Sequence, residues 1–114
     1  MRTLSIGWTI NYYNKKVQDD VKRLPVDIYA DYLRLTGLMI EFGIDLRMPH
    51  SKAMGSGLFE LRCKGSEGIG RVFYCAIAGK QIAILHSFVK KTDKTPPKEL
   101  NIAKRRLKEV KNEQ

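Results

Sequence analysis

Residues 58–91, "LFELRCKGSEGIGRVFYCAIAGKQIAILHSFVKK", predict three consecutive β-strands. The expected strands are "LFELRCK" (58–64), "GRVFYCAIAG" (70–79) and "QIAILHSFVKK" (81–91), which are rich in the branched and aromatic residues that favour strands. The short turns "GSEG" and "GK" separate them, and turns of this length join antiparallel neighbours. The stretch therefore predicts a three-stranded antiparallel meander.

Side chains two residues apart on a strand point to the same face, so the sequence also predicts what each face of the first hairpin carries. Folding this hairpin about "KGSEGI" places Arg62 opposite Arg71 and Leu61 opposite Val72. One face is then apolar and consists of Phe59, Leu61, Val72, Tyr74 and Ala76. The other face collects Glu60, Arg62, Lys64, Arg71 and Phe73.

Two arginines directly across a strand pair repel each other, which costs roughly a few tenths of a kcal/mol. A bound phosphate would explain Arg62 and Arg71, because guanidinium groups present paired donors that match phosphate oxygens. The alternative is that Glu60 satisfies Arg71 diagonally and that solvent covers the other cations. The residues alone leave both interpretations open.

The third strand of the meander predicts one bulky face, formed by Ile82, Ile84, His86 and Phe88. If this face packs on helices, His86 is buried beside its apolar neighbours. Lys91 then lies on the opposite face and joins the two arginines.

The segments before the meander predict a strand and a helical hairpin. "TLSIGWTINYYN" (3–14) alternates like a strand, and "NKKVQDDVKRL" (14–24) has helical spacing and is followed by a proline. "VDIYADYLRLTGLMIEFG" (26–43) predicts a second helix that stops at its glycine, and the polar residues 44–57 predict a loop. The expected apolar side of the second helix consists of Tyr29, Tyr32, Leu33, Thr36, Met39 and Ile40.

After a double proline, "KELNIAKRRLKEV" (98–110) predicts a last helix with one narrow apolar stripe. The order is strand, two helices, three strands, helix. It predicts a single α+β domain over residues 1–114, with an antiparallel sheet packed on helices.

The composition of the 114 residues is that of an ordinary globular domain, with 43% hydrophobic and 29% charged residues. The formal net charge of +9 favours polyanionic partners such as nucleic acid. Neither a membrane span nor a signal peptide is recognisable, so we expect a cytoplasmic protein without a membrane partner. Cys63 and Cys75 fit no zinc spacing and are expected to be reduced core residues.

The run "GLFELR", a turn, "GRVFY" and "IAILHSFVKKTDKTPPKELNIAKRR" resembles the RelE superfamily of toxins, specifically its HigB-type branch with phage-derived relatives. The resemblance covers about residues 50 to 108. It implies a RelE-like fold and the toxin of a type II toxin-antitoxin pair, which enters the ribosomal A site and cleaves messenger RNA. It also implies no metal or other cofactor, a 2′,3′-cyclic phosphate product, and a small helix-turn-helix antitoxin as partner.

The candidate site residues fall into three roles: phosphate binding, RNA binding and proton transfer. By this resemblance Arg62 and Arg71 clamp the phosphate, and Lys90 or Lys91 stabilises the transition state. Candidates for RNA binding are Lys52, Lys64, Phe73 and Lys94, with Phe73 stacking on a base. Candidates for the general base are Glu60 and His86.

Two other function classes compete with the enzyme. The first is a noncatalytic RNA-binding or host-interaction protein on the same fold, because fold does not fix function. The second is a DNA-binding regulator, which is disfavoured because no helix-turn-helix segment is recognisable. The basic "KRRLKEVK" stretch could contact RNA, face solvent or be covered by an acidic antitoxin, and the sequence does not rank these three.

Overall fold

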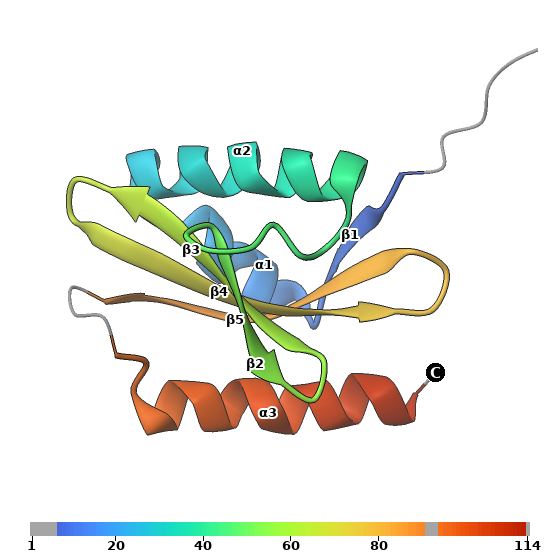
Figure 1. Cartoon of the computed structure of the whole chain (residues 1–114). Coiled ribbons are helices and arrows are strands. Elements are labelled where there is room, and N and C mark those ends of the chain that lie inside the picture. The colour runs from blue at the N-terminus through green and yellow to red at the C-terminus, as the bar shows by residue number, and fades with distance from the viewer. Residues whose placement is uncertain (1–6, 91–93, 114) are drawn as a thin grey trace, which may run out of the picture.

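The computed structural model describes residues 7–90 and 94–113, which form an α+β fold with a five-stranded sheet (Figure 1). The strand order across the sheet is β1-β5-β4-β3-β2. The elements along the chain are β1 (Thr9–Tyr12), α1 (Lys15–Lys22), α2 (Val26–Phe42), β2 (Ser51–Gly55), β3 (Leu58–Gly65), β4 (Gly68–Ile77), β5 (Gln81–Lys90) and α3 (Pro97–Asn112).

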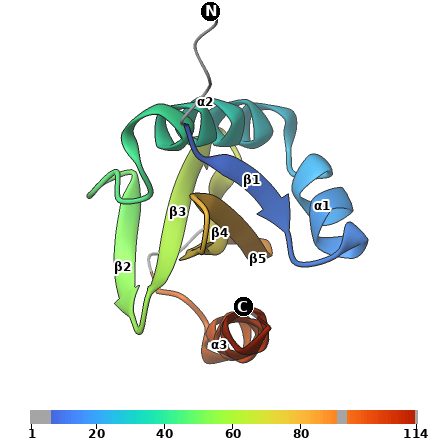
Figure 2. The same cartoon turned by 90° about the vertical axis from the view of Figure 1, so that its right-hand side faces the viewer.

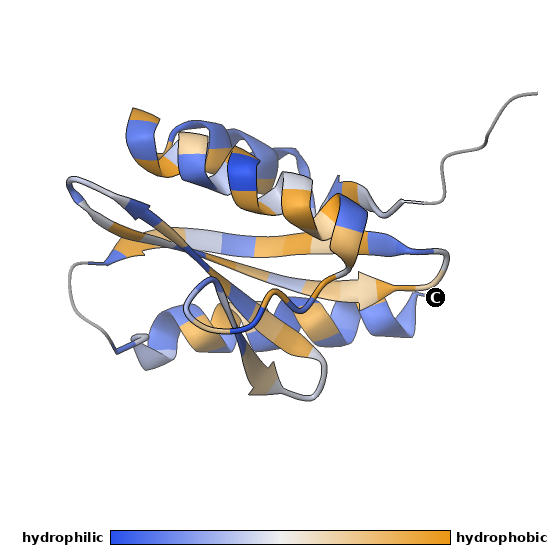
Figure 3. Ribbon diagram, turned by 45° about the horizontal axis from the view of Figure 1, so that its top comes forward, coloured by the Kyte–Doolittle hydropathy of each residue, from blue (hydrophilic) through white to orange (hydrophobic). Residues whose placement is uncertain are grey.

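The sheet is covered on both faces. Helices α1 and α2 lie on one face and α3 crosses the other, as the two orthogonal views show (Figures 1 and 2). The core under α1 and α2 includes Val21, Ile28 and Tyr32, whereas the core under α3 includes Leu85 and Leu107. Hydrophilic and hydrophobic residues alternate along α3 (Figure 3), as expected for a helix with one buried stripe.

The predicted register of the first hairpin is confirmed, since Arg62 pairs with Arg71 and Leu61 with Val72. The prediction of an antiparallel sheet is wrong in one place, because β1 runs parallel to β5. The helices α1 and α2 separate β1 from the meander, and a crossover of this length allows a parallel strand. The sheet is therefore mixed.

Two further expectations for the first half of the chain are wrong. The segment 44–57 is not entirely a loop, because Ser51–Gly55 forms the edge strand β2 against β3. Leu33 and Ile40 do not lie on the buried side of α2, where they are 51% and 37% exposed. The buried side consists of Ile28, Tyr32, Leu35, Thr36 and Met39.

Both cysteines are free and fully buried, as predicted. Burial raises the pKa of the Cys63 thiol and of the Cys75 thiol above the ordinary value, because a thiolate is poorly solvated among apolar side chains. No helix in the described part of the chain is long and apolar enough to cross a membrane.

A β-bulge interrupts the pairing of β4 with β5. Phe73 pairs with His86, but the next residue, Tyr74, pairs with Ile84, so Leu85 is an extra residue in β5. A bulge reverses the alternation of faces beyond it. The prediction that His86 is buried beside Ile84 is therefore wrong, because Ile84 packs under α2 while His86 lies on the α3 side.

Close contact between α2 and the sheet depends on Gly70 in β4. A β-carbon there would lie 2.4 Å from Cγ2 of Ile28, which is too close for any side chain. We expect Gly70→Ala to lower the free energy of unfolding by about 1–3 kcal/mol, measured by urea denaturation. The matched control is Gly37→Ala on the exposed side of α2, where no atom lies within 4 Å. It should raise the same free energy by about 0.5–1 kcal/mol. Equal stability of the two variants would contradict this packing.

Candidate functional site

A cleft of about 310 Å³ opens between the β2–β3–β4 part of the sheet and the start of α3. We call it the cationic cleft, because four basic side chains and one carboxylate line it. Its lining consists of Lys52, Met54, Glu60, Arg62, Arg71, Lys94, Thr95 and Leu100. Five residues of the predicted site, Lys52, Glu60, Arg62, Arg71 and Lys94, therefore meet at one place although they come from four segments of the chain.

The floor of the cationic cleft is a buried ion pair. Arg71 Nη1 donates to Glu60 Oε1 at 2.9 Å, and each side chain exposes 1% of its surface. The other carboxylate oxygen of Glu60 accepts a hydrogen bond of 2.6 Å from the Thr95 hydroxyl. The interpretation in which Glu60 satisfies Arg71 diagonally is thus confirmed for this pair, and it holds the segment before α3 against β3.

The remaining cations of the cleft are more accessible than Arg71. Arg62 is half-buried, and Lys52 and Lys94 are exposed. Because Arg62 pairs with Arg71 across the strands, its guanidinium comes from the same face and lines the mouth of the cleft. The negatively charged oxygens of a phosphate group are ligands that suit such a set of cations.

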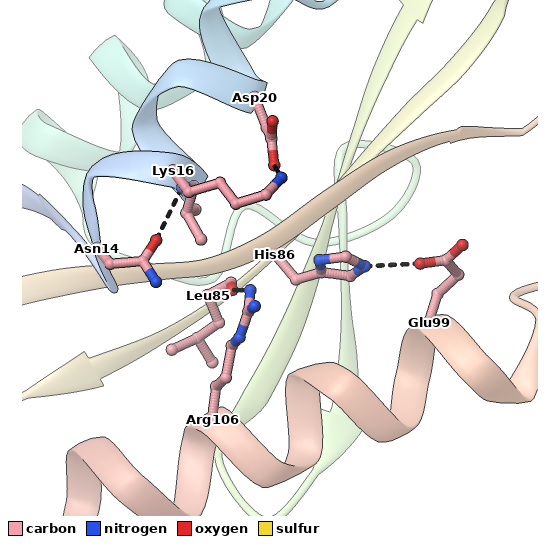
Figure 4. A network of polar contacts seen from close by, with 8 residues as sticks. Asn14, Lys16, Asp20, Leu85, His86, Glu99 and Arg106 are labelled. Carbon is pink, nitrogen blue, oxygen red and sulfur yellow. Dashed lines mark hydrogen bonds and ion pairs between the residues drawn. The ribbon is translucent and has the colours of Figure 1, made fainter.

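His86 and Glu99 form a second polar group, between β5 and α3 (Figure 4). His86 Nε2 lies 2.6 Å from Glu99 Oε1, so α3 supplies the partner of a β5 side chain. Arg106 of α3 donates a 2.8 Å hydrogen bond to the carbonyl oxygen of Leu85, the extra residue of the bulge. The helix thereby holds the backbone conformation that turns His86 to this side.

Phe73 cannot stack on a base in this structure, because it is fully buried. Its ring packs against the rings of His86 and Phe88, with centroids 6.4 and 5.9 Å away. The prediction of an RNA-stacking role for Phe73 is therefore corrected to a packing role. The bulge is the reason, since it brings these two β5 side chains to the face that Phe73 occupies.

Two predicted lysines of the described residues, Lys64 and Lys90, do not line the cationic cleft. Lys64 shares the face of Arg62 but is exposed two residues further along β3. Lys90 is half-buried at the end of β5, opposite Ile69. Lys91 lies outside the described residues.

The sequence analysis missed Met54, Thr95, Leu100 and Glu99. Thr95 stands in the quoted motif and could have been chosen as a short hydrogen-bond donor, whereas the contact between Glu99 and His86 depends on the bulge. Within residues 7–90 and 94–113, no group of three or more His, Cys, Asp or Glu side chains is arranged to hold a metal ion.

Residues 19–108 match the protein family described as "Phage derived protein Gp49-like (DUF891)". The chain belongs to this family. No curated protein matches the sequence of this Gp49-like protein. Its fold is similar to that of a mutant of the E. coli toxin RelE in the free state, with a TM-score of 0.65, 12% identity, and coverage of 89% of this chain and 98% of that one.

A second similar structure is the archaeal RelE-RelB complex from Pyrococcus horikoshii OT3. It has a TM-score of 0.54 and 18% identity, and the match covers 76% of this chain and 99% of that one. The resemblance to the RelE superfamily is therefore confirmed, and the α+β fold of this Gp49-like protein is the RelE fold. Its place in the HigB-type branch stays a prediction.

Proposed function

We propose that this Gp49-like protein is the toxin of a type II toxin-antitoxin pair and cleaves messenger RNA in the ribosomal A site. The observation that carries the proposal is the cationic cleft, where, among residues 7–90 and 94–113, four basic side chains meet the carboxylate of Glu60 on a RelE fold. Proposed partners are messenger RNA on the ribosome and a small helix-turn-helix antitoxin.

The proposed reaction is attack of a ribose 2′-hydroxyl on the adjacent phosphorus. The O–P bond to the 5′-oxygen of the next nucleotide breaks, which leaves a 2′,3′-cyclic phosphate and a 5′-hydroxyl. The 2′-hydroxyl loses a proton to a base and the departing 5′-oxygen gains one. Negative charge grows on the phosphate oxygens in the transition state, and Arg62 with Lys52 and Lys94 is positioned to stabilise it.

Glu60 and His86 remain the two candidates for the general base. Glu60 lines the cleft, but both of its oxygens already accept hydrogen bonds, from Arg71 and Thr95. His86 does not line the cleft, and Glu99 engages its Nε2. A phosphate that draws Arg71 away from Glu60 would free one oxygen of the Glu60 carboxylate. Binding of the substrate would thus make Glu60 available as the general base.

Primer extension on a translated messenger RNA tests the proposal. With purified ribosomes and folded wild-type protein, we expect cuts within the A-site codon that carry 5′-hydroxyl ends. Without ribosomes the same protein should leave the RNA intact. If folded protein produces no cut on programmed ribosomes, the noncatalytic RNA-binding function replaces the enzyme.

A further inference from the structure

The cationic cleft has a neighbour on the far side of Met54. A second hollow of about 340 Å³ lies beyond this side chain, between the β2–β3 turn and the middle of α3. We call it the distal hollow, and it is lined by Met54, Gly55, Ser56, Lys104, Leu107 and Lys108. Because Met54 lines both spaces, the distal hollow adjoins the cationic cleft at this side chain, and both lie along α3.

The charged side chains that line the distal hollow are all basic. Lys104 and Lys108 are exposed, and its lining contains no acidic residue. The two lysines stand four residues apart on α3, where like charges destabilise a helix by roughly 0.2–0.5 kcal/mol. Lys111 lies on the same side, since its Nζ is 3.2 Å from where Gly57 in the neighbouring turn would carry a β-carbon. An anion between α3 and the turn would relieve this repulsion.

A third hollow of this molecule lacks this positive charge. A space of about 390 Å³ at the β1 edge is lined by residues that include Tyr13, Gln81 and Glu113, but by no lysine or arginine. It is larger than the distal hollow and yet offers nothing to a phosphate. Of these three hollows in the described part of the chain, only the two along α3 are lined by basic side chains.

We infer that the distal hollow is a binding site for single-stranded RNA that extends from the cationic cleft, with Lys104 and Lys108 contacting successive phosphates. This inference rests on the proposed function, because it takes the scissile phosphate to lie in the cleft. From Leu100 to Lys108 the helix rises about 12 Å. That length matches about three nucleotides at the spacing of a stacked strand, about 3.4 Å. Met54 and Leu107 supply apolar contact for a base or ribose between the lysines.

The test is the affinity of a fluorescently labelled single-stranded RNA octanucleotide, measured by anisotropy over a range of salt concentrations without ribosomes. The Lys104→Ala/Lys108→Ala variant should bind more weakly than wild type. The slope of log affinity against log salt should become shallower by about 1.4, because each lost lysine-phosphate contact to a single strand contributes about 0.7. Alanine favours helix, so α3 should stay folded.

The matched control is Lys98→Ala/Arg105→Ala, which removes two charges from the same helix. Both side chains are exposed, stand seven residues apart and line neither space. This variant should keep the wild-type slope. If both variants lose RNA affinity and salt slope equally, the effect comes from the overall charge of the protein, and the inference is overturned. Unchanged RNA binding in the Lys104→Ala/Lys108→Ala variant would also overturn it, and would leave an acidic protein segment as the occupant to test.

The cleavage assay tests the proposed enzyme, and the RNA-binding assay tests the distal hollow, so each idea can be refuted without the other. A wild-type protein that binds the octanucleotide through Lys104 and Lys108 but cuts nothing on ribosomes would refute the enzyme and keep the RNA site. A protein that cuts on ribosomes, but whose Lys104→Ala/Lys108→Ala variant binds RNA with the wild-type affinity and salt slope, would refute only the RNA site.

Discussion

Arg71→Ala should lower the free energy of unfolding by about 3–5 kcal/mol, because it leaves the Glu60 carboxylate buried without its partner. Each member of this pair exposes 1% of its side chain, so water cannot replace the lost hydrogen bond. Urea denaturation followed by circular dichroism measures the effect. Loss of cleavage in this variant would then reflect unfolding as much as catalysis.

The control removes both charges together. Glu60→Leu/Arg71→Met fills the same space with apolar atoms, and such replacements of buried ion pairs are often neutral or stabilising. We therefore expect the double variant to recover most of the stability that Arg71→Ala loses, while the cationic cleft loses the Arg71 cation and the Glu60 carboxylate. If the free energy of unfolding of Arg71→Ala lies within about 1 kcal/mol of the wild-type value, Arg71 and Glu60 are not a buried, energetically coupled pair.

The first hairpin shows what the sequence could predict. Between the turn and Tyr74, side chains alternate strictly between the two faces of the sheet. This alternation alone predicts that Arg62 lies opposite Arg71 and that Glu60 shares their face. Three residues of the cationic cleft, Glu60, Arg62 and Arg71, follow from this register. Lys94 comes from the quoted motif, whereas Lys52 is expected in a loop from the sequence and lies on β2 in the structure.

The errors have a common physical origin in long-range contacts. The bulge at Leu85 is held by Arg106, which lies 21 residues further along the chain, and nothing in "AILHSF" marks it. The parallel pairing of β1 and the edge strand β2 likewise depend on where other elements pack. One extra residue in β5 was enough to move His86 to the opposite face, and α3, which covers that face, makes Phe73 part of a core.

Arg62→Ala should slow cleavage on the ribosome by about 100-fold or more while leaving the fold intact. Removing one donor to an oxyanion typically costs about 10²–10³ in rate. Arg62 is half-buried and lines the mouth of the cleft, so its loss creates no buried charge, in contrast to the loss of Arg71. Single-turnover cleavage of a programmed ribosome measures the rate, and urea denaturation verifies the stability.

Two further variants make the result specific to the guanidinium of Arg62. Arg62→Lys keeps the charge but loses the planar pair of donors, so its rate should lie between those of wild type and Arg62→Ala. Lys22→Ala removes an exposed charge from α1, on the other face of the sheet, and should cleave like wild type. If Arg62→Ala cleaves as fast as Lys22→Ala, the phosphate does not react in the cationic cleft, and cleavage must then be assigned to another surface of the RelE fold.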